Sequence, residues 1–428
     1  MPRSLLLKLV SYAKTEGPID WALRYNPFVR GRVLEALRHS GRESQAELLR
    51  DALQVARKTR YGAGRSEIPG EWPVLSKETL HAAPMDFIHR HALPRIPAAS
   101  GGTTGMPLKL WRSLECIAAE QVFLDELLAD YKFSMRSRMA VLRADAVKPV
   151  QETDPPYGRI SHGGNRLTLS TAHLNAATLC WYVGELKRFA PSILWVYPSA
   201  AINLYTLMER AGLTLSIPVM LASSEGLNGA THAALAQFFG CTLVNYYGQA
   251  ERVCLASSTK PGMFYFHPAY GHVELIPSPE ENAFKIIATG YWNHAMPLVR
   301  YDTGDLLYAP PQTDPERIAR GEAPFTAIAG RDGEYLLTRE GMRIIGLNHI
   351  PREVEHVAQM QLAQPDYDTL IIRVIPLPSF CESDAKRLQD QARAKLPRSM
   401  IVSVEIADRL VTTPRGKTPF VIRAIEKR

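Results

Sequence analysis

The segment most suited to chemistry in this chain is residues 100–105, which read Ser-Gly-Gly-Thr-Thr-Gly. Its glycines allow a tight turn in which successive backbone N–H groups point at one anion, and its three hydroxyls add further donors. Such a segment can bind phosphate, although the same composition is as typical of a surface turn. It is not the P-loop of the common NTPases, because Met106 and Pro107 follow Gly105 where that loop has Lys and Ser or Thr.

A second group of polar residues, 246–251, reads Tyr-Tyr-Gly-Gln-Ala-Glu and follows the apolar run 242–244. A tyrosine ring can stack on a nucleobase, and the Glu251 carboxylate can hold a hard cation such as Mg²⁺ through oxygen. A core tyrosine and a solvated glutamate explain the same residues. Judged alone, this motif leaves both interpretations open.

Two further motifs lie nearer the C-terminus. In 301–305, Tyr-Asp-Thr-Gly-Asp, the Asp305 carboxylate directly follows a glycine turn and could accept both hydroxyls of a ribose. A β-turn with two solvated aspartates is the alternative. Gly416 and Lys417 lie in a polar loop, where a lysine is ordinarily a solvated charge.

The elements that must position these residues alternate along the chain. Alternation of helical and strand-like patterns predicts an α/β fold around a mainly parallel sheet, whose strand ends bind ligands. Helices are predicted at 45–58, 114–128, 175–189, 200–211 and 232–239, and strands at 138–142, 193–197, 216–222 and 242–246.

Three regions are predicted. Residues 1–60 form a helical lead-in, residues 61–331 a large α/β domain, and residues 332–428 a small α/β domain attached by a hinge and carrying Lys417. A β-rich subdomain begins at about residue 271, with strands at 272–276, 284–289, 298–301, 306–309 and 334–338 and a loop at 310–324. In the small domain, strands are predicted at 342–345, 370–374 and 401–406, and helices at 352–360, 384–396 and 420–426.

The composition, 46% hydrophobic and 22% charged over 428 residues, is that of an ordinary globular protein of two or three domains. No apolar run is long enough to span a bilayer, and five scattered cysteines without a CxxC pair indicate a reducing, cytoplasmic location.

The net charge of +7 is uneven, since residues 1–65 and 386–428 each carry +7. These ends could face an acidic partner, a polyanion or a membrane surface, or could be solvated helix faces. The absence of a compact basic stripe with aromatics argues against nucleic-acid binding.

In their order, these motifs resemble the adenylate-forming superfamily of acyl-CoA synthetases and adenylation domains. The branch with phenylacetate-CoA ligase, coenzyme F₃₉₀ synthetase-like proteins and CapK-like proteins is the closer match. The resemblance covers roughly residues 65–428. The family's S-S/G-G-T-T-G-x-P, Y-G-x-S/T-E, Y-x-T-G-D, G-R-x-D and G-K motifs match residues 100–107, 247–251, 301–305, 330–332 and 416–417, and Ser223-Ser224-Glu225 occupies the place of its G-A/S-E turn.

The resemblance implies a large domain with mixed, mainly parallel sheets, a β-rich subdomain and a small mobile C-terminal domain. It also implies a reaction in which a small-molecule carboxylic acid attacks the α-phosphate of ATP, giving acyl-AMP and pyrophosphate. An acceptor then takes the acyl group. CoA is the family default, and transfer to an acidic carrier protein docked on the basic segments, to an amine or to a sugar stays open. A homodimer stays open, and so does a non-catalytic nucleotide-binding protein on the same fold.

The resemblance also implies roles for individual residues. Glu251 would hold Mg²⁺, Asp305 would bind the ribose hydroxyls, and Arg331 would approach the ribose and phosphate. Lys417 would bridge the α-phosphate and the acyl carboxylate, where a mobile ammonium can follow developing charge. The remaining nucleotide contacts would be Ser100, Gly101, Gly102, Thr103, Thr104 and Gly105 at the β- and γ-phosphates, with Thr103 also catalytic, and Ser224, Glu225, Tyr246, Tyr247 and Gly248 around the adenine.

The chain departs from the family pattern at several positions. Ala250 replaces the Ser or Thr that donates a hydroxyl to the α-phosphate, and Gly101 replaces a common Ser or Thr in the phosphate loop. Leu108 stands where Lys often follows the loop proline, so Lys109 is shifted by one. After Arg331 the spacing is irregular, so the hinge residue is uncertain.

Some relatives in this branch bind a structural zinc ion through Cys and His ligands. Cys254 and His267 stand where two ligands would lie, but no cysteine occurs between Cys254 and Cys381. Four ligands cannot be assembled in the expected way, and no zinc is predicted.

Overall fold

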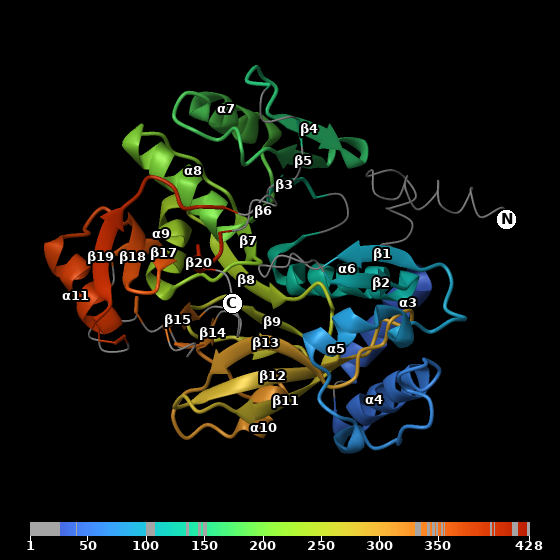
Figure 1. Ribbon diagram of the computed structural model, residues 1–428. Coiled ribbons are helices and arrows are strands. Elements are labelled where there is room, and N and C mark those ends of the chain that lie inside the picture. The colour runs from blue at the N-terminus through green and yellow to red at the C-terminus, as the bar shows by residue number, and fades with distance from the viewer. Residues whose placement is uncertain are drawn as a thin grey trace.

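The computed structural model describes most of the chain (Figure 1). The predicted phosphate loop 100–105, Arg331 and Lys417 lie outside the described residues. The described residues are 26–39, 41–99, 108–133, 137–143, 147–148, 152–329, 335–339, 343–344, 347, 350–351, 354, 356–393, 396–397, 399–412 and 418–425.

The largest sheet has eight strands in the order β10-β9-β8-β7-β6-β3-β5-β4. Its five central strands, β8 to β5 in that order, are parallel, and β4, β9 and β10 are antiparallel additions at its two edges. This arrangement confirms the predicted mainly parallel sheet. The strands are β3 (Met139–Leu142), β4 (Gly158–Ser161), β5 (Arg166–Leu169), β6 (Ile193–Val196), β7 (Val219–Ser223), β8 (Thr242–Gly248), β9 (Leu255–Ser258) and β10 (Tyr265–Phe266).

Helices cover both faces of this sheet, which is why its strands read as continuous apolar runs. In β7, Met220 and Ala222 pack toward α7 (Leu179–Phe189), α8 (Pro198–Arg210) and α9 (Gly229–Phe239). Val219 and Leu221 pack on the other side, with α3 (Pro27–Arg38) and α6 (Leu114–Leu127). The four helices predicted between residues 114 and 239 are therefore confirmed, as is α4 (Arg42–Ala56).

A second, antiparallel sheet follows, with the order β11-β12-β13-β14, and confirms the predicted β-rich region. The prediction of separate strands at 298–301 and 306–309 is wrong, because one strand, β13, runs from Tyr301 to Tyr308. Its register against β12 slips, with Asp302 opposite Ile287 but Leu306 opposite Lys285. The strands are β11 (Gly271–Pro277), β12 (Ala283–Gly290), β13 (Tyr301–Tyr308) and β14 (Ala327–Ala329).

Residues 303–305 form a bulge within β13 that a pattern of alternating residues cannot reveal. Gly304 has a φ of 70°, in the left-handed region that favours glycine, and its N–H donates to Asp302 Oδ1 at 2.8 Å. Further along, the predicted loop 310–324 contains a short helix, α10 (Pro315–Ala319), because the Asp314 side chain caps its first turn.

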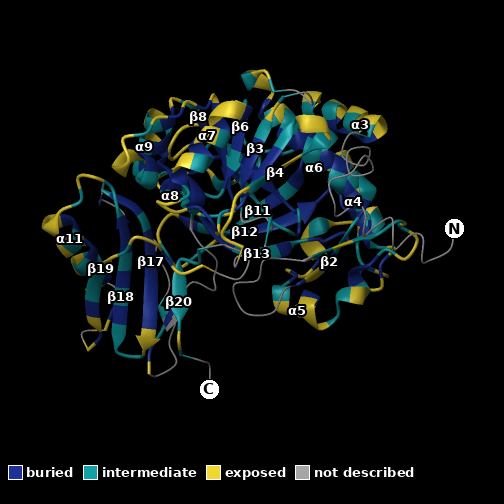
Figure 2. Cartoon of the chain, turned by 90° about the horizontal axis from the view of Figure 1, so that it is seen from above, coloured by how far each residue is buried: buried dark blue, intermediate teal, exposed yellow. Residues whose placement is uncertain are grey.

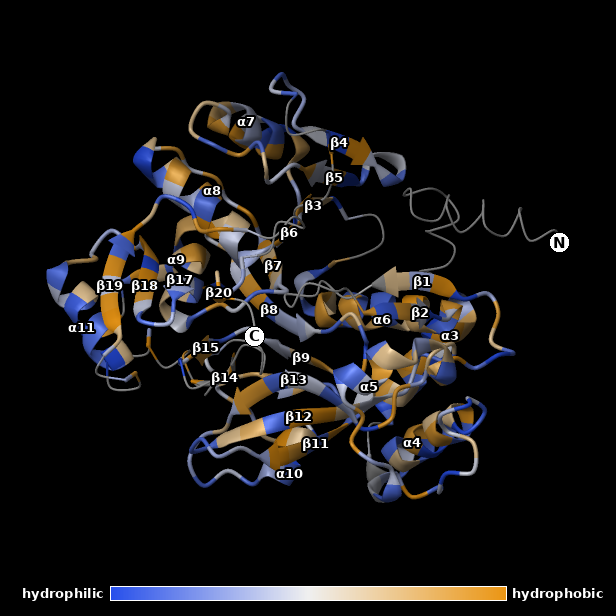
Figure 3. Ribbon diagram, in the orientation of Figure 1, coloured by the Kyte–Doolittle hydropathy of each residue, from blue (hydrophilic) through white to orange (hydrophobic). Residues whose placement is uncertain are grey.

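The C-terminal region is built on a four-stranded sheet with the order β19-β18-β17-β20 and one helix, α11 (Glu382–Arg393). In Figure 3, apolar residues colour β18 and β19, whereas hydrophilic residues dominate α11. The predicted strands at 370–374 and 401–406 and the helix at 384–396 are confirmed. The elements are β15 (Leu336–Leu337), β16 (Arg343–Ile344), β17 (Val357–Asp366), β18 (Thr369–Pro376), β19 (Ile401–Ile406) and β20 (Val421–Arg423).

The helices predicted at 352–360 and 420–426 are wrong, because β17 and β20 are strands. β17 lies between β18 and β20, and its polar residues Gln361 and Gln364 are buried. Their side-chain amides bond to backbone groups of Val411, Pro419 and Leu337, which removes the cost of burying them. Residues 357–360, at the start of β17, are nearly all buried, and so short an apolar stretch has no period that separates a strand from a helix.

This C-terminal sheet lies beside α8 and α9, as two views show (Figures 1 and 2). Thr231 Oγ1 donates to the Ala358 carbonyl at 2.7 Å, and Asn228 Nδ2 donates to the Val357 carbonyl at 3.0 Å. Ala358 joins the core formed by α7, α8 and α9. The C-terminal sheet is thus docked by both apolar and hydrogen-bonded contacts.

A small hairpin of β1 (Ile96–Ala99) and β2 (Lys109–Arg112) flanks the predicted phosphate loop on both sides. Leu108 is fully buried and Lys109 is exposed, so the two residues at this departure from the family pattern face different surroundings. Within the described ranges, no helix is long and apolar enough to cross a membrane. The remaining helices are α5 (Lys77–Ala82) and the 3₁₀ turns Pro69–Glu71, Pro84–Phe87, Ala129–Tyr131 and His162–Gly164.

Candidate functional site

Two motifs that are far apart in sequence meet at the end of β8. The Tyr247 hydroxyl donates to Asp305 Oδ2 at 2.7 Å, joining the Y-G motif to the bulge in β13. Asp305 is only 8% exposed, and its backbone N–H donates to Thr303 Oγ1 within the bulge. Burial and then the charge of Asp305 raise the pKa of Tyr247 well above its ordinary value, so this phenol stays a donor.

Glu251, the predicted Mg²⁺ ligand, is also tied to β13. The Tyr301 hydroxyl donates to Glu251 Oε1 at 3.0 Å, and both residues are buried. Among the described residues no three His, Cys, Asp or Glu side chains cluster as metal ligands. One carboxylate fits Mg²⁺ in the usual arrangement, in which one or two carboxylates and the phosphates of the substrate share the ion. One strand, β13, thus orients both the predicted ribose ligand and the predicted metal ligand.

Tyr246 and Tyr247 point to opposite faces of β8, as successive residues of a strand must. The Tyr246 hydroxyl donates to buried Glu120. The structure therefore brings the Tyr247 side chain, but not that of Tyr246, to Asp305. A Cβ at Gly248 would lie 2.8 Å from the Tyr246 hydroxyl oxygen, so glycine is needed there to accommodate the ring.

Two arginines that the sequence motifs did not single out hold the loop after β8. Arg112 Nη2, on β2, donates to the Ala250 carbonyl at 2.8 Å. Arg252 Nη1 lies 3.3 Å from Glu120 Oε2 and donates to the Cys116 carbonyl at 3.2 Å. The available signals were their positions, Arg112 at the end of the hairpin that flanks the phosphate loop and Arg252 directly after Glu251.

Glu120 and Arg252 form a largely buried ion pair, with side-chain exposures of 13% and 16%, and the Tyr246 and Tyr270 hydroxyls donate to the same carboxylate. Burial opposes the charge on Glu120, but Arg252 and the two hydroxyls outweigh it, so the pKa of Glu120 lies below its ordinary value. Arg252 has a φ of 56°, a strained conformation for a residue with a side chain. The ion pair holds this strained residue next to Glu251.

Ser224 and Glu225 follow β7, at the same edge of the sheet. Ser224 has a φ of 73°, and the Arg143 Nη2 donates to its hydroxyl at 3.1 Å. Glu225 Oε2 accepts the Ser199 N–H at 2.8 Å, and Glu225 Oε1 accepts the Ser199 hydroxyl and the Thr418 N–H, each at 3.0 Å. Thr418, near the C-terminus, therefore contacts this edge of the sheet.

Arg143 is another residue that the motifs missed. It follows β3, and its guanidinium carbon lies 4.2 Å from the ring centroid of Trp195 and 5.1 Å from that of Tyr197. Trp195 Nε1 in turn donates to Ser223 Oγ at 3.1 Å. Cation–aromatic stacking links the carboxyl ends of β3 and β6, and the Trp195–Ser223 hydrogen bond adds β7.

The two residues weighed as zinc ligands have other partners. Gln249 Nε2 donates to Cys254 Sγ at 3.0 Å, and burial raises the pKa of the Cys254 thiol to about 12. His267 Nε2 lies 2.8 Å from the Ser257 hydroxyl. The absence of zinc stays a prediction, and elemental analysis of chelator-washed protein should show far less than one equivalent per chain. About one equivalent of zinc would contradict it.

His267 predicts a pH dependence of stability. Burial lowers its pKa from 6.5 to about 4, so between these values the unfolded chain binds a proton that the folded chain does not. The contribution of the neutral ring is complete above pH 6.5 and is lost as the pH falls toward 4. We expect a loss of up to about 3 kcal/mol from this group.

Urea unfolding at a series of pH values measures this loss, and His267→Gln should flatten the profile in that window. His81→Gln, at an exposed position on α5, is the matched control and should leave the profile as it is. An unchanged profile in His267→Gln would contradict the assignment.

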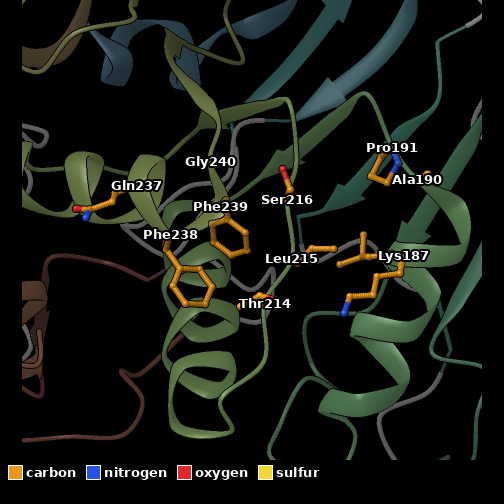
Figure 4. A pocket seen from close by; sticks show the side chains of 11 residues that line it. Lys187, Ala190, Pro191, Thr214, Leu215, Ser216, Gln237, Phe238, Phe239 and Gly240 are labelled. Carbon is orange, nitrogen blue, oxygen red and sulfur yellow. The ribbon is translucent and has the colours of Figure 1, made fainter.

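A cavity of about 510 Å³ lies at the opposite edge of the sheet from these motifs. Its lining includes Pro191, Ser216 and Gly240, which precede β6, β7 and β8, and Figure 4 shows Phe239 and Leu215 between Phe238 and Lys187. The cavity therefore lies at the amino ends of the parallel strands. It is separate from the edge that Tyr247, Glu251 and Glu225 share.

Comparison with known proteins agrees with this geometry. The family model for the CapK C-terminal domain matches residues 336–424. The chain is 22% identical over 360 residues to Protein CapK of Staphylococcus aureus. The aligned region covers 83% of this chain and 80% of that protein. It is 26% identical over 211 residues to phenylacetate-coenzyme A ligase of Aromatoleum evansii, over 46% of this chain and 45% of that enzyme.

Solved structures share the fold. A crystal structure of 2-hydroxyisobutyryl-CoA ligase in the postadenylation state, in complex with 2-HIB-AMP, matches with a TM-score of 0.59 and 13% identity over 89% of each chain. A second complex of that ligase, with R3-HIB-AMP, matches with a TM-score of 0.58. The motifs, the fold and these relatives agree in their similarity to the adenylate-forming superfamily, in the branch that contains CapK and phenylacetate-CoA ligase.

Proposed function

We propose that this protein uses ATP to activate a carboxylic acid and then passes the acyl group to an acceptor. The observation that carries the proposal is the meeting of Tyr247, Asp305 and Glu251 through β13, at the edge that Thr418 also reaches. In the first step, an oxygen of the acid attacks the α-phosphorus of ATP. The bond from that phosphorus to the bridging oxygen breaks, and pyrophosphate leaves with its electron pair.

The protein's part in this step is positioning and neutralisation of charge. Asp305, held by Tyr247, would accept the ribose hydroxyls, and the Tyr247 ring would stack on adenine. Glu251, oriented by Tyr301, would hold Mg²⁺, which neutralises phosphate charge when bound. The loop 100–105, Arg331 and Lys417 would complete the phosphate contacts, and these roles rest on the motif resemblance.

CoA is the acceptor we propose, with magnesium and ATP as the other requirements. The names of the relatives support it, because both phenylacetate-coenzyme A ligase and 2-hydroxyisobutyryl-CoA ligase are CoA ligases. The acid itself is not assigned. An acidic carrier protein is the alternative acceptor that the basic segment 386–428 favours, and salt-sensitive binding would distinguish it.

The test is a screen for ATP–pyrophosphate exchange and pyrophosphate release with aryl, fatty, hydroxy and amino acids, with and without CoA. Exchange that requires both an acid and Mg²⁺ is the expected result. Mass spectrometry of the purified protein should also find a bound acyl-AMP, whose mass would name the acid. ATP binding without exchange for any acid would favour a non-catalytic nucleotide-binding protein and contradict the proposal.

A further inference from the structure

Arg143, which directly follows β3, has few partners for a charged side chain. Its guanidinium stacks on the rings of Trp195 and Tyr197. Among the described residues, its hydrogen-bond acceptor is the Ser224 hydroxyl, 3.1 Å from Nη2, and its buried Nε has no acceptor. This guanidinium therefore keeps donors that the described part of the chain does not use.

The carboxylates around this edge of the large sheet are held by other groups. They are Glu120 with Arg252, Glu225 with Ser199 and Thr418, Glu251 with Tyr301, and Asp305 with Tyr247. Within the described ranges, none of these carboxylates forms an ion pair with Arg143. The positive charge of Arg143 is thus left for an anion from outside the chain.

The surroundings of Arg143 suit it to bind such an anion. Stacking on two rings fixes the plane of the guanidinium, so little freedom is lost when its N–H groups bind. A carboxylate can accept two parallel N–H bonds from a guanidinium. Such a ligand would also satisfy the buried Nε, whose missing hydrogen bond is otherwise costly.

The place of Arg143 fits the acid better than the nucleotide. Asp305, the proposed ribose ligand, lies with Tyr247 on one face of β8. Trp195, on which Arg143 stacks, packs instead against the core that contains Tyr246, and the Tyr246 side chain points to the other face. An acid that meets the α-phosphate through its reacting carboxylate must extend away from the nucleotide, and its far end can lie on that other face.

We propose that Arg143 binds a second acidic group of the acid substrate, which makes this protein a ligase of dicarboxylic acids. The inference rests on the proposed function. One carboxylate attacks the α-phosphate, while the other stays ionised on Arg143 and does not react. Arg143 thereby determines specificity, because an acid with an apolar far end would cover the charged guanidinium without giving it an acceptor.

Matched pairs of acids test the inference. The diacids malonate, succinate, glutarate and 4-carboxyphenylacetate are compared with propanoate, butanoate, pentanoate and 4-methylphenylacetate, in which a methyl group replaces the second carboxylate. In ATP–pyrophosphate exchange, kcat/KM for the best diacid should be about 10- to 100-fold above that for its methyl partner, the range expected for hydrogen bonds to a charged group. Arg143→Met, whose side chain can still pack on both rings, should remove this preference. Equal use of every pair, or an unchanged preference in Arg143→Met, would overturn the inference.

Calorimetric binding of the same acids, with and without an α,β-methylene analogue of ATP, separates the two proposals. At least one diacid should bind the unmodified protein more tightly than its methyl partner, and Arg143→Met should abolish the difference. Arg143→Lys, a point charge in place of the planar fork, should restore part of it. If no acid supports exchange, the proposed function fails, whereas these affinities still decide the role of Arg143. No diacid binding, or a loss of affinity for the ATP analogue alone in Arg143→Met, would contradict that role.

Arg138→Met is the matched control. Arg138 directly precedes β3 as Arg143 directly follows it, and its guanidinium carbon lies 6.0 Å from the ring centroid of Phe189. The variant removes a guanidinium near an aromatic ring from the opposite end of the same strand, so the diacid preference should stay as in the unmodified protein. An equal loss of preference in both variants would mean that net charge, and not Arg143, selects the diacid.

Discussion

Replacing Lys417 with alanine is expected to slow acid-dependent ATP–pyrophosphate exchange by about 10²- to 10³-fold. The ammonium would neutralise charge that develops between the attacking carboxylate and the α-phosphate, and alanine offers nothing in its place. Because Ala250 already lacks the hydroxyl that relatives place at the α-phosphate, this chain should depend on the lysine strongly. The effect should lie in the rate of adenylation rather than in ATP binding.

Initial rates of exchange, together with ATP affinity by calorimetry, measure this prediction. Affinity should stay within about two-fold, since a group that acts only in the transition state contributes little to the ground state. Lys386→Ala, an exposed lysine on α11, is the control and should behave like the unmodified protein. Normal exchange in Lys417→Ala would remove the assigned role.

Replacing Arg252 with methionine is expected to lower the free energy of unfolding by roughly 3–5 kcal/mol. The substitution removes the ion-pair partner of the largely buried Glu120 carboxylate and leaves it the Tyr246 and Tyr270 hydroxyls and the more distant charge of Arg112, and a largely buried charge without its ion-pair partner is costly. It also releases the strained backbone next to Glu251. We therefore expect the Mg²⁺ concentration needed for half-maximal activity to rise as well.

Denaturant unfolding and magnesium titration of activity measure these two effects. The double variant Glu120→Gln with Arg252→Met should be more stable than Arg252→Met alone, because it no longer buries an unpaired charge. Arg320→Met, which breaks surface pairs with Glu316 and Glu322, should cost no more than about 1 kcal/mol. A similar small loss in Arg252→Met would mean that Glu120 finds solvent or another partner.

The sequence predicted most of the large sheet and its helices because alternating strand and helix patterns there are long and apolar. β7 is buried on both faces, and a run such as 216–222 has few other ways to fold. Patterns failed where a local rule conflicted with tertiary surroundings. The start of β17, which lies between two strands although a helix was predicted at 352–360, and the bulge at 303–305 are two such places.

The sequence predicted the motif residues of the candidate site but not the residues that hold them in place. Tyr247, Glu251 and Asp305 were named from motif order, and the structure shows which of their groups meet. The hydrogen-bond and ion-pair partners of Glu225 and Arg252 could not be predicted from the sequence, because Ser199, Thr418 and Glu120 lie far away along the chain. Hydrogen bonds between such distant residues depend on the assembled fold rather than on any local pattern.

The bulge in β13 has a practical meaning for anyone who redesigns this protein. Tyr301 precedes it and Asp305 ends it, so the number of residues in the bulge sets the spacing between Asp305, the proposed ribose ligand, and Tyr301, which orients the proposed metal ligand Glu251. Deleting or inserting one residue there would reverse which face of the strand Asp305 occupies. Loop grafting between relatives should therefore keep residues 301–305 as a single block.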